Sequence, residues 1–159
     1  MATFREQRNI EASIEDWLKE ILIEHNWTNI TIEKSFKKVY TQKFPVICMN
    51  ITSTESVRKE IGNKVWINYY TLSIRIFGEN DGQREDLTDF LSDKLENDVD
   101  YYEYKTREGQ VVDKELKGRI CLLKILRNEK EFSTSETVEK EDRYRQLISV
   151  QCYIAKQEN

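Results

Sequence analysis

Two carboxylates and one lysine lie close together in the second half of the chain. Asp100 is followed by Glu103 and Lys105. Carboxylate oxygens are the ligands that Mg²⁺ prefers, and a neighbouring lysine helps to orient the water molecule that attacks beside the metal ion. The chemistry that these three residue types suggest is therefore metal-assisted hydrolysis.

The same three residues resemble the Asp…Glu-x-Lys arrangement of metal-dependent nucleases, but only in part. The wider strand spacing that usually separates the Asp from the Glu is absent. The surrounding segment Glu79–Glu108 also holds 11 acidic and 4 basic residues, so a match of this kind arises easily by chance. A Mg²⁺-dependent nuclease, or another nucleic-acid-processing protein, is kept as an alternative function.

Other patterns that would support catalysis or metal binding are missing from the sequence. His25 is the one histidine, and it falls in the last turn of a predicted helix, where a cation complements the helix dipole. The five glycines are scattered and form no phosphate-binding loop. Cys48, Cys121 and Cys152 contain no Cys-x-x-Cys pair, and each lies in an apolar run, which predicts buried free thiols. We therefore expect no enzyme activity, no cofactor and no metal ion.

Charge is distributed unevenly along the chain. The net charge is −4, which disfavours binding to nucleic acid or to an anionic membrane. A basic stretch contains Lys34, Lys37, Lys38 and Lys43, with Phe36 and Tyr40 between them. Such a mixture can grip single-stranded nucleic acid, although a strand edge protected by lysines explains it more simply. Glu79–Glu108 is the acidic counterpart of this stretch.

The periodicity of apolar residues predicts two helices. Ile10, Ile14, Trp17, Leu18, Ile21 and Leu22 recur at helical spacing in a first helix from Thr3 to His25. Thr3 and Glu6 have the spacing of a capping box, and Asn26 is a suitable stop. A second helix from Asn80 to Asn97 has an apolar stripe that includes Leu87 and Leu91, and Asn80 with Gln83 forms its predicted cap.

Alternating apolar residues predict strands over most of the remaining chain. The expected strands are Asn29–Glu33, Val46–Thr54, Val65–Phe77, Asp98–Lys105, Arg119–Arg127 and Tyr144–Ile154. The second and third form a hairpin, and both faces of Arg119–Arg127 are apolar, which predicts a central position in the sheet. Residues 106–118 are expected to be a polar loop. A charged arm is expected at about residues 128–143.

These elements predict one α+β domain over residues 1–159, with a mostly antiparallel β-sheet and two main α-helices packed on one face. No apolar run approaches the roughly 18 residues of a membrane span, so a soluble protein made in the cytosol is expected. A content of 11% aromatic residues supports a packed core.

The order of elements resembles that of the tail terminator (tail completion) proteins of long-tailed bacteriophages. An amphipathic first helix precedes a long hairpin around Pro45–Phe77, a helix follows the strand that ends Ile74-Arg75-Ile76-Phe77-Gly78, and two closing strands carry Ile120–Leu126 and Leu147–Ile154. This resemblance covers most of the chain as a pattern and contains no diagnostic short motif. The charged arm departs from the pattern.

The resemblance implies a structural protein of the virion tail or neck. Such proteins form a ring, usually a hexamer, that caps the tail tube protein, ends tube polymerisation and presents a surface to the head-completion or connector protein. DNA would pass through the ring without specific binding. The candidate subunit-interface residues are Lys34, Lys37, Lys38, Lys43, Glu85, Asp86, Asp89 and Asp93.

A smaller role remains open for the charged arm. If the protein is instead an adaptor that binds a single partner, the arm is the segment expected to make the contact, because long loops in compact domains usually bind something. Its candidate residues are Glu129, Lys130, Glu131, Phe132, Glu139, Lys140 and Glu141.

Overall fold

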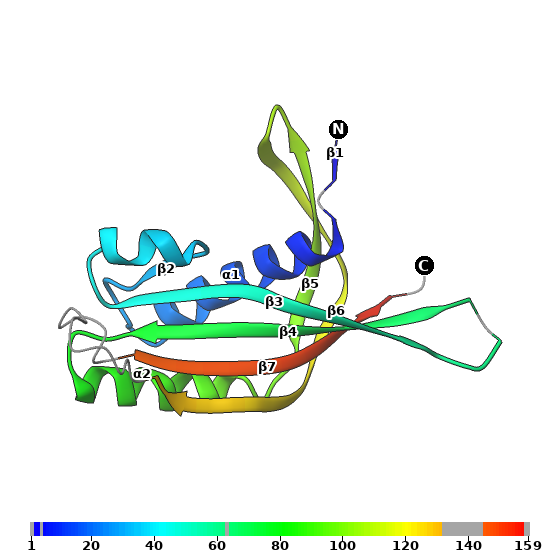
Figure 1. Cartoon of the computed structure of the whole chain (residues 1–159). Helices are drawn as coiled ribbons and strands as arrows, with labels where there is room; N and C mark the ends of the chain where they lie inside the picture. Colours follow the sequence, from blue (N-terminus) through cyan, green and yellow to red (C-terminus); the bar gives the residue numbers. More distant parts are fainter. Residues whose placement is uncertain (1, 4, 63, 132–144, 158–159) are drawn as a thin grey trace.

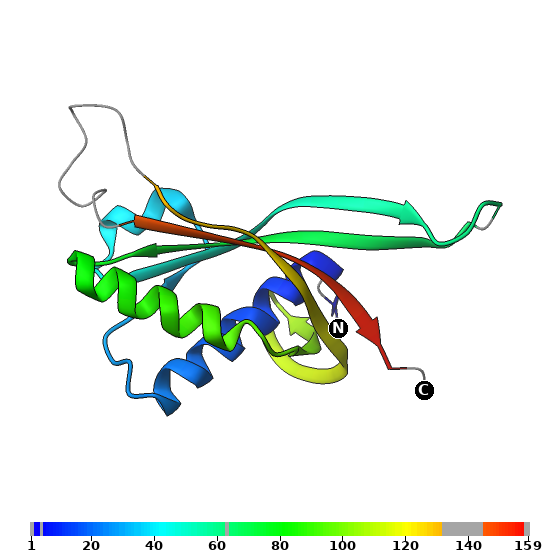
Figure 2. The same cartoon turned by 90° about the horizontal axis from the view of Figure 1, so that it is seen from below.

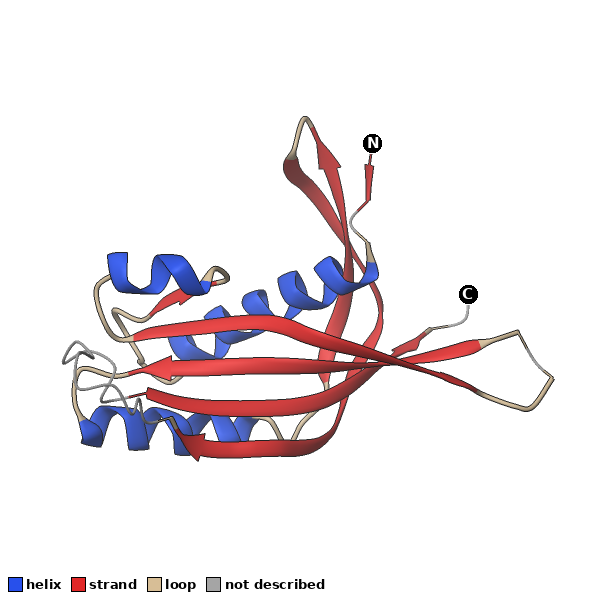
Figure 3. Cartoon of the chain, in the orientation of Figure 1, coloured by secondary structure: helices blue, strands red, loops and turns tan. Residues whose placement is uncertain are grey.

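A computed structural model describes residues 2–3, 5–62, 64–131 and 145–157 of the chain. Its long strands lie side by side, and the helices lie next to them (Figure 3). The elements follow one another as β1 (Ala2–Thr3), α1 (Glu6–Glu24), β2 (Thr31–Glu33), the 3₁₀ helix η1 (Phe36–Thr41), β3 (Val46–Arg58), β4 (Trp66–Phe77), α2 (Asp81–Lys94), β5 (Val99–Arg107), β6 (Gln110–Lys130) and β7 (Arg145–Lys156).

The strands of the described residues form one sheet in the order β1-β5-β6-β7-β4-β3-β2. Neighbouring strands are antiparallel, except that β2 runs parallel to β3. The sheet bends strongly, so that β5 and the first part of β6 turn away from the plane of β3, β4 and β7 (Figure 1). The predicted α+β fold with a mostly antiparallel sheet is confirmed.

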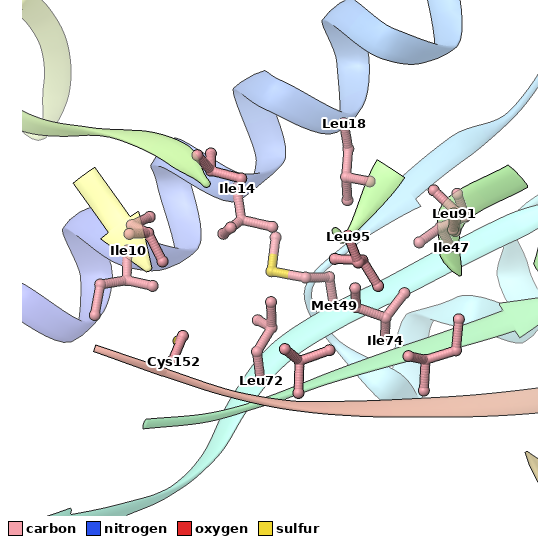
Figure 4. Packing of buried hydrophobic residues seen from close by; sticks show 14 of the residues in the cluster. Ile10, Ile14, Leu18, Ile47, Met49, Leu72, Ile74, Leu91, Leu95 and Cys152 are labelled. Carbon is pink, nitrogen blue, oxygen red and sulfur yellow. The ribbon is translucent and has the colours of Figure 1, made fainter. Parts of the chain in front are cut away.

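The core lies between α1, α2 and one face of the sheet, as the sequence predicted. Side chains from both helices meet alternate residues of β3, β4 and β7 in one apolar cluster. Met49 reaches from β3 towards α1, among Ile14, Leu72 and Leu95 (Figure 4). Each large side chain that is fully buried in this way contributes about 1.5–3 kcal/mol to stability.

The predicted start of α2 is confirmed in atomic detail. The side chain of Asn80 accepts a hydrogen bond of 2.8 Å from the backbone N–H of Gln83. In return, the Gln83 side chain accepts one of 2.8 Å from the backbone N–H of Glu79. Two backbone donors that the helix leaves unpaired are therefore satisfied at this end.

The predicted capping box of α1 is wrong. Thr3 belongs to β1, which pairs with β5, and the helix begins at Glu6 after an N-cap Arg5 whose side chain makes no capping bond. Glu6 is used elsewhere, because its carboxylate accepts a hydrogen bond of 2.7 Å from the hydroxyl of Tyr70. The predicted stop is confirmed, since Asn26 follows the helix with a left-handed φ of 59°.

The polar loop predicted over residues 106–118 is also wrong, because this segment forms a β-hairpin of β5 and β6. Arg107 pairs with Gln110, and Glu108 and Gly109 form the turn with φ values of 52° and 81°. Positive φ at both central residues matches the twist of a tight hairpin. The residues from Gln110 to Leu116 are all exposed, so they lack the apolar alternation that would have indicated a strand.

The predicted strand Val65–Phe77 is confirmed as β4, but one of its residues was misplaced. Tyr70, Leu72, Ile74 and Ile76 line the core as expected. Trp66, predicted on the same buried face, is 52% exposed because β3 and β4 extend beyond the helices as a projecting hairpin (Figure 2).

Polar side chains of α1 close the neighbouring edge of the sheet. The buried Asn9 accepts a hydrogen bond of 3.1 Å from the backbone N–H of Tyr104. The buried Ser13 accepts one of 3.0 Å from the N–H of Tyr102, both on β5. On the opposite side of the helix, the Glu11 carboxylate accepts a hydrogen bond of 3.2 Å from the N–H of Ile51 on β3. The helix thus supplies acceptors to backbone donors on both β5 and β3.

The thiols of the chain are free, as predicted. Cys48 and Cys152 are buried, whereas Cys121 on β6 is half-buried, so the prediction of burial holds for two of the three. Burial raises the pKa of the Cys48 thiol, and it raises the pKa of Cys152 to about 12. Both buried thiols are therefore protonated at neutral pH and poor nucleophiles.

We expect replacement of Asn9 by Ala to lower the free energy of unfolding by about 1–3 kcal/mol, because the N–H of Tyr104 would lose its acceptor inside the core. Denaturant titration monitored by circular dichroism measures this loss. Gln7→Ala changes an exposed residue of the same helix and should stay within about 0.5 kcal/mol of the wild type. Equal effects of the two variants would contradict the assigned role of Asn9.

Three buried tyrosines predict a loss of stability at alkaline pH. Burial raises the pKa of Tyr101 from 10.0 to about 12. Burial, followed by hydrogen bonds to Glu6 and Asp16, raises the pKa of Tyr70 and of Tyr104. The unfolded chain ionises first, so the stabilising contribution is complete below the usual pKa of 10.0 and disappears as pH rises towards 12.

Denaturant midpoints measured on either side of the usual tyrosine pKa test this prediction. The wild type should lose stability more steeply with pH than Tyr101→Phe, which removes one titrating group. Tyr69→Phe is the matched control, because Tyr69 lies on the other face of β4 and is only half-buried. Parallel curves for the wild type and Tyr101→Phe would contradict the prediction.

Candidate assembly interface

The basic stretch predicted as an interface forms η1 and the turns on either side of it, rather than a strand edge. Lys37, Lys38 and Lys43 are exposed and have no ion-pair partner among the described residues. Lys34 pairs with Glu15 of α1 at 2.9 Å. Within the part of the chain that the structure describes, three of the four predicted lysines are thus available to an external anionic surface.

The aromatic residues between these lysines anchor η1 to the sheet. Phe36, Tyr40 and Phe44 surround Phe77, with ring centroids 5.8–6.1 Å from it. They form a small second cluster with Val39 and β3, on the face of the sheet that the α-helices leave uncovered. The aromatic rings therefore hold the basic stretch in place, although Phe36 and Tyr40 remain 36% and 37% exposed.

The acidic candidates lie on α2. Asp86, Asp89 and Asp93 are exposed and have no ion-pair partner among the residues described. Glu85 is already occupied, because its carboxylate lies 3.2 Å from the Lys130 ammonium of β6. The acidic face that remains open to another molecule consists of these three aspartates.

The basic and acidic surfaces lie on opposite faces of the sheet. η1 contacts β2 and β3, the last two strands at one edge. α2 packs against β4 and β7, and its Ser92 hydroxyl accepts a hydrogen bond of 3.1 Å from the amide of Asn128 on β6. η1 and α2 lie apart in Figure 1, and among the described residues no ion pair joins their charged side chains.

The second half of β6 is an open strand edge. Its pairing with β5 ends where Ile120 meets Val99, and from Cys121 to Lys130 it pairs only with β7 among the described strands. Register shifts between Leu122 and Lys124 and between Ile125 and Arg127 leave Leu123 and Leu126 as bulged residues. Backbone groups along such an edge are ready to pair with another chain.

Apolar side chains accompany this open edge. Leu123, Ile125 and Leu126 are between 44% and 47% exposed. A groove runs beside them, between the end of α2 and β6, and it is lined by Leu95, Glu96, Leu122, Leu123, Lys124, Ile125 and Val150. The prediction that Arg119–Arg127 is central is right for its place in the strand order but wrong for its burial, because β5 pairs only with the beginning of this stretch, up to Ile120.

The predicted charged arm is described only at its base. Phe132, Glu139, Lys140 and Glu141 lie outside the described residues. The Glu129 carboxylate forms an ion pair with Arg127 at 3.7 Å, and the Lys130 ammonium forms an ion pair with Glu85.

Glu131 pairs with two arginines at the start of the arm. Its carboxylate lies 3.4 Å from Arg75 of β4 and also forms an ion pair with Arg145 of β7. The Arg145 guanidinium stacks 4.9 Å from the Phe36 ring, and that of Arg75 lies 5.6 Å from the same ring. Glu131 thus joins the base of the arm to the cluster that carries the basic stretch.

The residues considered for hydrolysis do not converge. Asp100 pairs with Arg119 across the ladder, whereas Glu103 pairs with Glu115, and a register shift lies between the two positions. Lys105 lies 3.6 Å from Glu115 on β6. No group of three or more His, Cys, Asp or Glu residues in the described ranges is arranged to hold a metal ion.

His25 has the helix-end role that the sequence suggested. Its Nδ1 atom donates to the Ile21 carbonyl oxygen at 3.0 Å, and its ring packs against Phe90 of α2, with 5.2 Å between ring centroids.

No helix in the described residues is long and apolar enough to span a membrane. Comparison of the sequence with models of protein families and with curated proteins gave no match.

We expect Glu131→Gln to destabilise the fold by about 1–3 kcal/mol, because two largely buried guanidinium groups would lose their shared carboxylate. Thermal and denaturant unfolding measure the effect. Glu129→Gln removes the same charge from an exposed pair and should cost less than about 1 kcal/mol. If both substitutions have the same small effect, the ion pairs of Glu131 do not hold the base of the arm.

Proposed function

We propose that this protein is a structural component that assembles head to tail into a closed ring. The observation that carries the proposal is the separation of two complementary surfaces: exposed lysines on and beside η1 on one face of the sheet, and exposed aspartates on α2 on the other. A head-to-tail interface joins two different patches of identical subunits, and it closes into a ring when the rotation between subunits permits.

The geometry favours contact between subunits over contact within one. Among the described residues, Lys37, Lys38 and Lys43 form no ion pair with Asp86, Asp89 or Asp93, because η1 and α2 lie on opposite faces of the sheet. A neighbouring copy could instead bring its basic surface against the acidic one. Complementary charge of this kind guides the encounter and sets the register of the subunits.

The biological role that we propose follows the resemblance to tail terminator proteins. The ring, expected to be a hexamer, would cap the tube protein of a bacteriophage tail, stop its polymerisation and join the tail to the head connector. The net charge of −4 suits a ring through which DNA passes without being held, because like charges repel. This role makes no use of a cofactor.

Charge reversal tests the ring directly. We expect Asp89→Lys combined with Asp93→Lys to weaken assembly at least about tenfold, because attraction across the interface becomes repulsion. Native mass spectrometry measures the oligomer, and electron microscopy of the wild type should show rings with a central hole. Adding Lys37→Glu and Lys38→Glu to the same chain should restore assembly, since the two surfaces exchange charge.

A control with the same change in net charge separates a specific contact from general repulsion. Glu20→Lys with Glu24→Lys reverses two exposed residues near the end of α1 and should assemble like the wild type. The proposal fails if the α2 reversal leaves the oligomer intact, or if the control disrupts assembly equally.

A further inference from the structure

The hairpin of β3 and β4 projects beyond the body of the protein (Figures 1 and 2). Its pairing continues to the end of the strands, where Arg58 faces Trp66 and the N–H of Lys59 donates to the Val65 carbonyl at 3.2 Å. Tyr70 is the last residue of β4 at this end that belongs to the core. The five residues from Tyr70 to Val65 span roughly 17 Å at about 3.4 Å each, so the hairpin is an ordered ribbon that holds its tip well away from the core.

Exposed apolar side chains surround the hairpin tip, which we define as residues 57–62 and 64–66. Ile61, in the turn, is fully exposed, and Val65 is 53% exposed. Val57 and Trp66, which are 43% and 52% exposed, belong to successive pairs of the β3–β4 ladder, so they point to opposite faces of the ribbon. The tip therefore presents apolar area on both of its faces and at its end.

Basic side chains lie at the same level as these apolar ones. Arg58, Lys59 and Lys64 are exposed, and Glu60 is the one acidic residue of the tip, which gives the tip a net charge of +2. The Arg58 guanidinium lies 5.0 Å from the centre of the Trp66 ring. Tryptophan together with arginine and lysine is the combination that proteins place at the boundary between water and lipid.

The distribution of the apolar side chains indicates what kind of partner they fit. A protein surface that met one face of the ribbon would leave either Val57 or Trp66 in water, because the two point in opposite directions. A DNA groove can enclose a ribbon, but it would place Glu60 and several apolar side chains beside phosphates. A lipid interface surrounds an inserted tip, so it removes the apolar area of both faces from water.

We propose that the hairpin tip inserts into the interfacial region of a lipid bilayer that contains anionic lipids. Ile61 and Trp66 enter the boundary between headgroups and acyl chains, and the basic side chains contact lipid phosphates. The insertion goes beyond the ring proposed above and does not depend on it, because the tip shares no residue with the charged surfaces on η1 and α2.

The length of the hairpin reconciles this proposal with the net charge of the chain. A charge of −4 on the whole protein repels an anionic membrane. Charges in physiological salt are screened beyond about 8 Å, however, and the ribbon holds the core roughly 17 Å from the tip. The membrane surface therefore meets chiefly the charge of the tip, which is attractive.

Flotation of the full-length protein with vesicles tests the insertion. We expect the wild type to float with vesicles of phosphatidylcholine mixed with phosphatidylglycerol, and to float less with phosphatidylcholine alone. Ile61→Asp should lower the bound fraction at least about fivefold, because a charged side chain replaces the apolar one that enters the interface. Arg58→Gln combined with Lys59→Gln should remove most of the preference for the anionic vesicles.

Tryptophan fluorescence reports whether the tip itself enters the lipid. Trp17 and Trp27 pack against the core, whereas Trp66 is exposed on the ribbon. Anionic vesicles should shift the emission of the wild type to shorter wavelength, and brominated lipids should quench it. Trp66→Phe keeps an aromatic ring at the tip, so it should still float with the vesicles but lose most of the shift and of the quenching.

Val112→Asp is the matched control. Val112 is 52% exposed on the other hairpin of the protein, formed by β5 and β6, and the substitution adds the same charge as Ile61→Asp. This variant should bind vesicles like the wild type. Circular dichroism shows whether each variant is folded, and Arg58→Gln with Lys59→Gln tests the proposal even if Ile61→Asp does not fold.

The other outcomes overturn the insertion. Wild-type protein that does not float with anionic vesicles contradicts it, as does equal loss of binding in Ile61→Asp and Val112→Asp. Native mass spectrometry should show the same oligomer for Ile61→Asp as for the wild type. Dissociation of that variant would make the tip a contact between proteins, and binding of duplex DNA in place of vesicles, lost in Ile61→Asp, would make it a DNA-binding ribbon.

Discussion

The backbone groups at the edges of the sheet impose the constraint on which the rest of this structure depends. Donors along an outer strand need acceptors from water or from the protein. α1 supplies these acceptors on two sides, because Asn9 and Ser13 bind the backbone of β5 and Glu11 binds that of β3. The sheet can therefore bend around the helix, with its apolar face closed over Ile10 and Ile14.

One strand edge is treated differently from the others. β1 and α1 cover β5, and β2 with Glu11 covers the beginning of β3, whereas beyond Ile120 nothing among the described residues pairs with the side of β6 that faces away from β7. Two bulges and Lys124 interrupt this edge. Features of that kind discourage indiscriminate pairing of sheets, so they favour a partner whose shape fits the bulged strand.

The local periodicity of the sequence predicted which residues face the core, but it predicted little about the side chains that bind the backbone at the sheet edges. Ile47, Met49 and Ile51 recur at every second position because they line the face of β3 that meets the main core, and the cap at Asn80 depends only on residues three apart. Asn9 and Ser13 are polar residues whose partners lie about 90 positions away, so no local pattern could indicate them. The first half of β6 was missed because it is exposed on both faces. The second half of β6 was predicted to be central because apolar residues occupy both of its faces. That pattern is typical of a strand covered on two sides, but a strand beside an open apolar groove shows it too.

Charge and apolar contact have different tasks at the proposed interface. An exposed ion pair contributes about 0–1 kcal/mol, and salt at physiological strength screens charges beyond about 8 Å. Lys37, Lys38 and the aspartates of α2 can therefore select the orientation of a neighbour but cannot hold it alone. Lasting contact needs apolar area removed from water. On the described surface, the exposed side chains of Leu123, Ile125 and Leu126 at the edge of β6 offer such area. The charged surfaces then decide which approach succeeds, and the apolar ones determine how long the subunits stay together.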